Sequence, residues 1–300
     1  MVWSCLVSIL PGMAQTEKLT DYVNPFVGTD GYGNVYPGAQ IPFGGIQISP
    51  DTDSRFYDAA SGYKYNHLTL MGFSLTHLSG TGIPDLGDFL FIPGTGEMKL
   101  EPGTHEDPDQ GYRSRYSHDK EWASPNYYAV ELADYGVKAE MTSGVRSGMF
   151  RFTYPESDNA FIMIDMNHTL WQSCEWSNLR MINDSTITGY KLVKGWGPER
   201  HVYFTATFSK KLTGLRFVQD KKPVIYNTSR FRSSYEAWGK NLMACISFDT
   251  KAGEEVTVKT AISAVSTDGA RNNMKELDGL TFNELRAKGE ALWEKELGKY

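Results

Sequence analysis

The stretch GMFRFTY at residues 148–154 decides the fold class, because its large apolar side chains fall at every second position. Residues 256–262 read VTVKTAI and show the same alternation. A period of two places successive side chains on opposite faces of a β-strand, whereas a helix has a period of 3.6. These two stretches therefore predict strands with one buried face.

Further runs with the composition of strands lie between residues 110 and 265, and turn-forming residues such as those of DYG at 134–136 separate them. The runs cover 127–132, 137–142, 160–166, 186–192, 201–208, 241–248 and 255–263. Many short strands divided by turns are typical of an antiparallel sandwich. We therefore predict a mainly β protein, with a large, supersandwich-like antiparallel β-sandwich over residues 15–268.

The period changes after about residue 268. Thr281 and Glu284 have the spacing of a capping box, and an apolar stripe at helical spacing follows them, formed by Leu285, Gly289, Leu292, Trp293 and Leu297. The pattern predicts a helix from about 282 to 298, within a helical linker over residues 269–300. Its stripe either packs on a further domain or folds back on the sheets.

The composition excludes several classes of protein. The chain has 300 residues, 40% of them apolar and 22% charged, which indicates a folded protein with one large all-β domain or two ordinary ones. Thirty Lys and Arg against thirty-six Asp and Glu leave no basic excess for a nucleic acid partner. Aromatic residues form 13% of the chain and suit either a sheet core or stacking on sugar rings; for a single ring the core is favoured.

Residues 1–14 have features of an export signal and predict a secreted or periplasmic protein. The apolar run at 2–10 is too short to span a bilayer, and Gly12 and Ala14 are small residues of the kind that signal peptidase reads, although no Lys or Arg precedes the run. Cleavage after Ala14 leaves Cys174 and Cys245, which either pair or are buried thiols; we favour buried thiols. No other apolar stretch approaches 18 residues, so no membrane span is expected.

The segment Gly72–Asp88, GFSLTHLSGTGIPDLGD, combines hydroxyls, a histidine and two carboxylates with glycines. Short polar side chains on a Gly-rich loop suit the recognition of neutral polyols. The alternative is that Asp85 and Asp88 cap turns and that His77 is hydrogen-bonded inside the sheet. No histidine or cysteine spacing indicates zinc, and no acidic loop matches an EF-hand.

Several motifs resemble the amino-terminal domain of glycoside hydrolase family 92, whose members are exo-acting α-mannosidases. In chain order they include NPFVGT at 24–29, PGAQIPFG at 37–44, SGYKY at 61–65, the segment 72–88, YSHDKEWASPNYY at 116–128, DYGV at 134–137, KAGE at 251–254 and the helix around Trp293. The resemblance covers nearly the whole chain after residue 20.

The resemblance implies a β-sandwich, a helical linker and a larger carboxy-terminal barrel of helical hairpins, with the active site at the junction of the two domains. It implies calcium-dependent, inverting hydrolysis of terminal mannose from glycans. The acid, the base and most ligands of the calcium ion would belong to the carboxy-terminal domain, so no catalytic or metal-binding residue is expected in this chain.

The resemblance also implies that this chain supplies one wall of the sugar site. The candidate substrate-binding residues are Asp53, Tyr57, Tyr65, His77, Ser79, Thr81, Asp85, Asp88 and His118. Phe56 and Tyr57 stand where many members have tryptophans, and Lys64 replaces a histidine, so the linkage, α-1,2 or another, stays open. Two other readings remain: a free-standing carbohydrate-binding module, and a structural domain whose aromatic rings are all core.

Overall fold

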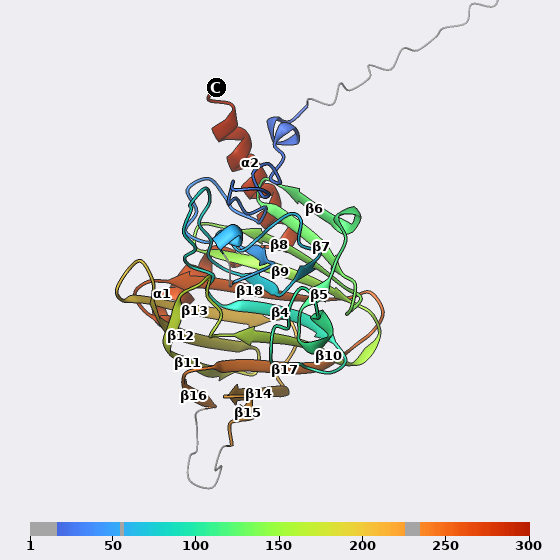
Figure 1. The fold of residues 1–300 in the computed structure, drawn as a ribbon, viewed down its shortest axis with the longest axis vertical. Helices are drawn as coiled ribbons and strands as arrows, with labels where there is room; N and C mark the ends of the chain where they lie inside the picture. Colours follow the sequence, from blue (N-terminus) through green and yellow to red (C-terminus); the bar gives the residue numbers. More distant parts are fainter. Residues whose placement is uncertain (1–16, 55–56, 226–234) are drawn as a thin grey trace, which may run out of the picture.

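Two antiparallel sheets form the body of the molecule in the computed structural model, which describes residues 17–54, 57–225 and 235–300 (Figure 1). A seven-stranded sheet has the order β1-β3-β4-β10-β17-β14-β15, and a nine-stranded sheet has the order β16-β11-β12-β13-β18-β9-β8-β7-β6. A two-stranded ribbon, β2-β5, stands apart from them. The prediction of a mainly β fold is confirmed.

The strands of the seven-stranded sheet are β1 Ser49–Asp51, β3 Gly72–Ser74, β4 Leu90–Thr95, β10 Ser157–Asp165, β14 Gly214–Gln219, β15 Lys222–Pro223 and β17 Leu242–Thr250. Those of the nine-stranded sheet are β6 Glu121–Ser124, β7 Tyr127–Leu132, β8 Val137–Ser143, β9 Ser147–Tyr154, β11 Ser173–Asn183, β12 Thr186–Lys194, β13 Arg200–Phe208, β16 Glu236–Gly239 and β18 Glu254–Ser263. The ribbon pairs β2 Thr69–Leu70 with β5 Ser114–Arg115.

Every strand run quoted from the sequence between 127 and 263 corresponds to a strand of the structure. The longest strand that the sequence did not predict is β11, and its side chains explain why. Its buried centre, Ser177–Leu179, consists of three consecutive buried residues with polar or exposed residues on both sides, so β11 shows no alternation. The edge strand β16 and the short strands β1 and β3 were also missed, since four residues or fewer carry little periodicity.

The core lies between the two sheets, and aromatic rings of facing strands meet in it. Phe150 and Phe152 of β9 are fully buried, and Phe91 of β4 approaches Phe150 with 4.9 Å between ring centroids. In β18 the alternating residues 256, 258, 260 and 262 are all buried, as their period predicts. Burial of one large apolar side chain contributes about 1.5–3 kcal/mol, so these contacts join the sheets.

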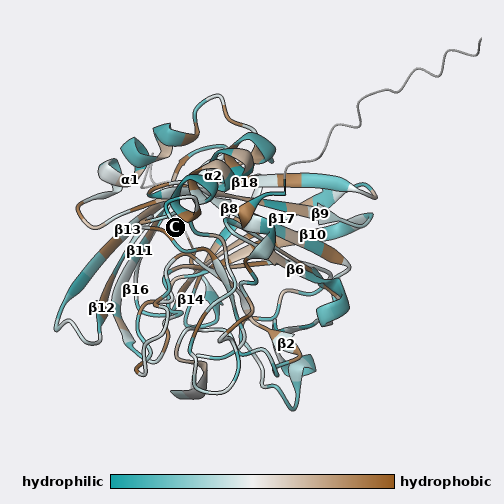
Figure 2. Cartoon of the chain, turned by 90° about the horizontal axis from the view of Figure 1, so that it is seen from above, coloured by the Kyte–Doolittle hydropathy of each residue, from teal (hydrophilic) through white to brown (hydrophobic). Residues whose placement is uncertain are grey.

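Two helices follow the last strand and lie on the outer side of the nine-stranded sheet (Figure 2). These are α1 Thr267–Met274 and α2 Phe282–Leu297, and the 3-10 helix η5 Lys275–Leu277 lies between them. The Thr281 hydroxyl accepts the Glu284 backbone N–H, and the Glu284 side chain accepts the Thr281 backbone N–H. The predicted helix and its capping box are therefore confirmed.

The apolar stripe of α2 folds back on the sheet over its first half. Phe282 and Leu285 are buried in a cluster with Tyr127 and Met149 of the sheet, whereas Leu292 is 43% exposed. The second half contacts the start of the described chain, where the 3-10 helix η1 Leu19–Tyr22 lies: Glu294 accepts the Thr20 backbone N–H at 2.7 Å. The helix thus links the sheet to the amino-terminal segment.

The two cysteines after residue 14 are buried and free, which confirms the favoured reading. In the three described ranges, no helix is both long enough and apolar enough to cross a membrane. The expected export signal at residues 1–14 lies outside the described residues. The domain boundaries expected at 14/15 and 268/269 stay predictions; the change of period near 268 falls inside α1.

Candidate functional site

Three loop segments, residues 28–36, 57–65 and 79–83, come together and are called the wall loops here. The Gly80 backbone N–H donates to the Asn34 carbonyl at 2.7 Å, and the Tyr65 N–H donates to the Thr29 carbonyl at 3.0 Å. A Cβ placed on Gly82 would lie 3.1 Å from the Tyr57 hydroxyl, so the second and third loops also touch. The three segments therefore form one continuous surface.

Four of the nine predicted sugar-site residues reach solvent from these loops. Tyr57 is 59% exposed, Tyr65 and Ser79 are exposed, and Thr81 is half-buried with its hydroxyl on the Ile83 carbonyl. The replacement Lys64 is buried and donates from Nζ to the Gly31 carbonyl, which ties two wall loops together. Exposed rings beside hydroxyls can bind the apolar face and the hydroxyl groups of a sugar.

His118 supports Tyr65 from behind. It lies in the 3-10 helix η4 His118–Lys120, and its ring is parallel to that of Tyr65 with 3.9 Å between centroids. Its Nδ1 is 2.6 Å from Glu121, whose carboxylate also accepts the hydroxyls of Tyr63 and Tyr128. His118 covers one face of the Tyr65 ring, and Phe26 also contacts this ring with 5.8 Å between centroids, so at most the other face is left for a ligand.

Asp88 is fully buried, and its carboxylate is neutralised by two cations. Lys191 Nζ lies 3.1 Å away and Arg200 Nη1 2.6 Å away, and Thr76 donates its hydroxyl at 2.7 Å. Burial alone would raise the pKa of Asp88, but Lys191 and Arg200 outweigh it and hold that pKa well below its usual value. Asp88 therefore anchors the 72–88 segment to β12 and β13, instead of capping a turn as the alternative reading of the sequence expected.

His77 is also buried and meets a carboxylate that the sequence did not single out. Its Nε2 lies 2.8 Å from Asp51 Oδ1, and its Nδ1 faces the Gln47 carbonyl at 2.8 Å. His168 Nε2 lies 2.8 Å from the other oxygen, Asp51 Oδ2. Burial raises the pKa of Asp51, but His77 and the hydrogen bond from His168 lower it further than burial raises it. We call Asp51, His77 and His168 the Asp51 cluster.

The remaining two candidates are buried at turns. Asp53 accepts the Ser54 backbone N–H at 2.7 Å and lies 3.3 Å from His105 Nε2. Asp85 accepts the Leu86 N–H at 2.6 Å, which is the turn-capping role weighed from the sequence. The structure therefore brings Tyr57, Tyr65, Ser79 and Thr81 to one surface, with His118 behind it, and places the three aspartates and His77 beneath.

Calcium takes six to eight oxygen ligands in proteins. Within the described part of the chain, no group of three or more His, Cys, Asp or Glu could hold a metal ion. The buried carboxylates of Asp51 and Asp88 are already engaged by histidines or by cationic side chains. These residues do not fit a calcium site, so the calcium expected from the resemblance stays a prediction about residues elsewhere.

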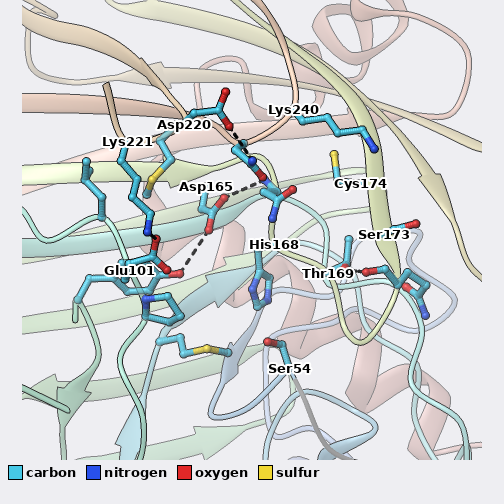
Figure 3. Close-up of a pocket in the computed structure, with 18 of the residues that line it drawn as sticks. Ser54, Glu101, Asp165, His168, Thr169, Ser173, Cys174, Asp220, Lys221 and Lys240 are labelled. Atoms are coloured by element: carbon cyan, nitrogen blue, oxygen red, sulfur yellow. Dashed lines mark hydrogen bonds and ion pairs between the residues drawn. The ribbon is translucent and has the colours of Figure 1, made fainter. Parts of the chain in front are cut away.

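A pocket of about 870 Å³ opens beside the Asp51 cluster, and none of the nine predicted residues lines it (Figure 3). In Figure 3, Asp165 and His168 lie near its centre, while Lys221 extends toward Glu101 and Ser54 lies at the opposite edge. Its other lining residues come from 71, 100–102, 112, 167–174, 220–221 and 240–243. No local pattern in the sequence predicts this pocket, because seven separate segments build it.

Comparisons with known proteins agree with the fold. Residues 22–263 match the Glycosyl hydrolase family 92 N-terminal domain. An uncharacterized secreted glycosidase of Arthroderma benhamiae is 26% identical over 304 residues, which cover 92% of this chain and 38% of that protein. The chain thus spans less than two-fifths of the length of this relative.

Two solved structures are similar over almost the whole chain. The family 92 glycosyl hydrolase ccman5 is 26% identical, with a TM-score of 0.79 over 93% of this chain and 37% of its own. The family 92 inverting mannosidase of Bacteroides thetaiotaomicron is 24% identical and shares the fold, with a TM-score of 0.78 over 95% of this chain and 37% of its own. Because the family match covers most of the sandwich, the chain belongs to glycosyl hydrolase family 92 and corresponds to its N-terminal domain.

Proposed function

We propose that this chain is the amino-terminal part of a secreted, calcium-dependent, inverting α-mannosidase and supplies one wall of its sugar site. The observation that carries the proposal is the surface of the wall loops, where Tyr57, Ser79 and Thr81 reach solvent side by side with glycines. The family membership and the mannosidase named among similar structures support mannose-containing glycans as substrate. The relative named as a secreted glycosidase supports export.

The chain's own residues would bind and orient the terminal sugar. The open face of Tyr65 and the exposed ring of Tyr57 would cover C–H groups, and the Ser79 hydroxyl would hydrogen-bond to sugar hydroxyls. An inverting hydrolase needs a carboxylic acid and a carboxylate about 6.5–9.5 Å apart. Asp51 and Asp88 are buried and paired, so they suit neither role, and we assign both roles to a carboxy-terminal domain.

The first test compares this chain with the longest natural form of the protein on an aryl α-mannoside. We expect no mannose release from the chain alone, and release by the longer form that a chelator abolishes. Hydrolysis by the chain alone would contradict the proposal. Saturable binding of mannobiose by the chain, with no hydrolysis by any longer form, would favour a free-standing binding module.

The second test changes the wall in the longer form. Tyr57→Ala is expected to raise KM about fivefold, since stacking on one sugar is worth on the order of 1 kcal/mol. Trp238→Ala is the matched control, because that ring is also exposed but lies on β16, outside the wall loops. Equal KM values for wild type and Tyr57→Ala would show that the wall loops are not part of the sugar site.

A further inference from the structure

The pocket beside the Asp51 cluster has a rim that is held rigidly from below. The rim loop, residues 166–172, connects β10 to β11. His168 is fixed by Asp51, and its carbonyl accepts Lys191 Nζ at 2.6 Å. The Leu170 N–H donates to the Leu86 carbonyl at 3.0 Å, and Gln172 Nε2 donates to the Pro84 carbonyl at 2.6 Å.

The rim loop, which these hydrogen bonds hold in place, exposes a tryptophan at the pocket. Trp171 is 65% exposed and has a φ of 71°, a backbone conformation that is rare for a bulky residue. Strain of this kind costs on the order of 1–3 kcal/mol and is found mainly at functional sites. The loop therefore keeps a large ring exposed to solvent despite backbone strain. Because the loop is already rigid, it would lose little conformational entropy when a ligand binds.

The charges that line the pocket disfavour an anionic ligand. Glu101 pairs with Lys221 at 2.6 Å, and Lys240 pairs with Glu175 outside the pocket at 3.2 Å. Asp165 and Asp220 accept hydrogen bonds only from neutral groups: Asp165 from Tyr112 and the Asn167 backbone, Asp220 from Asn241. Among the contacts of the described lining residues, Asp165 and Asp220 thus have no cationic partner. The pocket therefore carries a weak negative charge.

The rest of the lining matches hydroxyl groups. Amides and hydroxyls of Asn167, Thr169, Gln172, Ser173, Asn241 and Ser54 stand beside the apolar side chains of Met71, Leu100 and Met243. Amides and hydroxyls both donate and accept, as a polyol requires, whereas a cation would need acceptors alone. The volume of about 870 Å³ lies within the range of ligand pockets, about 300–1,000 Å³, which suits a small oligosaccharide.

We propose that this pocket is an accessory binding site for a neutral oligosaccharide, distinct from the wall loops, with Trp171 as its stacking ring. Binding there does not require the chain to be part of a hydrolase. Covalent capture is not involved, since burial raises the pKa of the lining thiol, Cys174, and keeps it protonated near neutral pH.

The test is calorimetric titration of the full chain with mannotriose, maltotriose and spermidine. We expect at least one trisaccharide to bind, and Trp171→Ala to weaken that binding at least tenfold without lowering the Tm, because the side chain is mostly in solvent. Asn167→Ala, which removes an exposed amide from the same loop, should weaken it as well. The matched control is Trp238→Ala on β16, a ring of 54% exposure that does not line the pocket.

Three results would overturn the proposal: no trisaccharide binding, binding of spermidine alone, or trisaccharide binding that Trp171→Ala leaves unchanged. Binding that is lost in Tyr57→Ala but kept in Trp171→Ala would place the sugar on the wall loops. That last result would contradict the proposed accessory site and would leave the proposed mannosidase function intact. Binding that is lost in Trp171→Ala but kept in Tyr57→Ala, with no mannosidase activity in any form of the protein, would support the accessory site. It would contradict the proposed mannosidase function.

Discussion

At the scale of single residues, Asp88 shows how a carboxylate in a Gly-rich loop becomes part of the framework. The Gly72–Asp88 segment contains hydroxyls and a histidine that suggest a ligand site, but the Asp88 side chain is fully buried. Lys191 is fully buried and has Asp88 as its anionic partner, 3.1 Å away. Removing the charge of Asp88 would leave a buried ammonium without that partner.

We expect Asp88→Asn to lower the free energy of unfolding by about 3–5 kcal/mol at pH 7, the usual cost of breaking a buried pair. The folded-state pKa of Asp88 lies below its unfolded value of about 3.9, so the stabilisation is present above that value. It is lost as the pH falls through the folded-state pKa. The difference between wild type and variant in urea unfolding should therefore shrink below about pH 4.

The control for this prediction is Asp109→Asn, which breaks an exposed pair with Arg115. Exposed pairs contribute about 0–1 kcal/mol, so this change should be nearly neutral. Equal losses in the two variants, or a gap that widens as the pH falls, would show that the Asp88 pair does not stabilise the fold.

At the scale of elements, α2 is the clearest case in which a local sequence pattern predicts the structure. The capping box forms as its spacing predicts, and the buried positions Phe282, Leu285 and Gly289 follow the helical period. Gly289 has a tertiary reason that no local pattern reveals. A Cβ at this position would lie 1.7 Å from Asn126 Nδ2, so the glycine permits the helix to approach the β6–β7 turn.

Thr281→Ala is expected to lower the free energy of unfolding by about 1 kcal/mol, because the first turn of α2 loses its cap. Thr281→Ser keeps the hydroxyl and should retain most of that stability. Thermal or urea unfolding of the two variants measures the difference. If Ser and Ala destabilise equally, the hydroxyl of Thr281 is not the group that holds the helix start.

At the scale of the whole molecule, the aromatic core joins the two sheets and thereby positions both candidate sites. The wall loops 57–65 and 79–83 follow β1 and β3 of the seven-stranded sheet, and the rim loop connects that sheet to the nine-stranded one. Phe150 contacts Phe91 and Phe73 across the sandwich. Its removal would leave a cavity between the layers.

We expect Phe150→Ala to lower the free energy of unfolding by about 3–5 kcal/mol, as for other buried aromatic rings. Phe150→Leu, which keeps most of the volume, should cost less. Tyr32→Ala, at a ring that is almost fully exposed, should change stability little. Similar losses for Phe150→Ala and Tyr32→Ala in urea unfolding would argue against an aromatic core that unites the sheets.

The sequence alone determined eight of the strands between 127 and 263, the cap and length of α2, the buried thiols and the family, whereas β11, β14, β15 and β16 were missed. Strand and helix periods, capping pairs and short motifs are local, so neighbours in the chain suffice to reveal them. The sequence also pointed to the exposed wall residues Tyr57, Tyr65, Ser79 and Thr81, because they lie in or beside the short motifs that resemble family 92.

Only the tertiary structure decided which polar groups meet. Asp51 joins His77, 26 residues away, and His168, 117 residues away, while Asp88 meets Arg200 across 112 residues. The pocket with Trp171 is assembled from seven segments. Such contacts depend on the order in which strands pair within the sheets, and that order is fixed by the packing of two whole layers rather than by any local period.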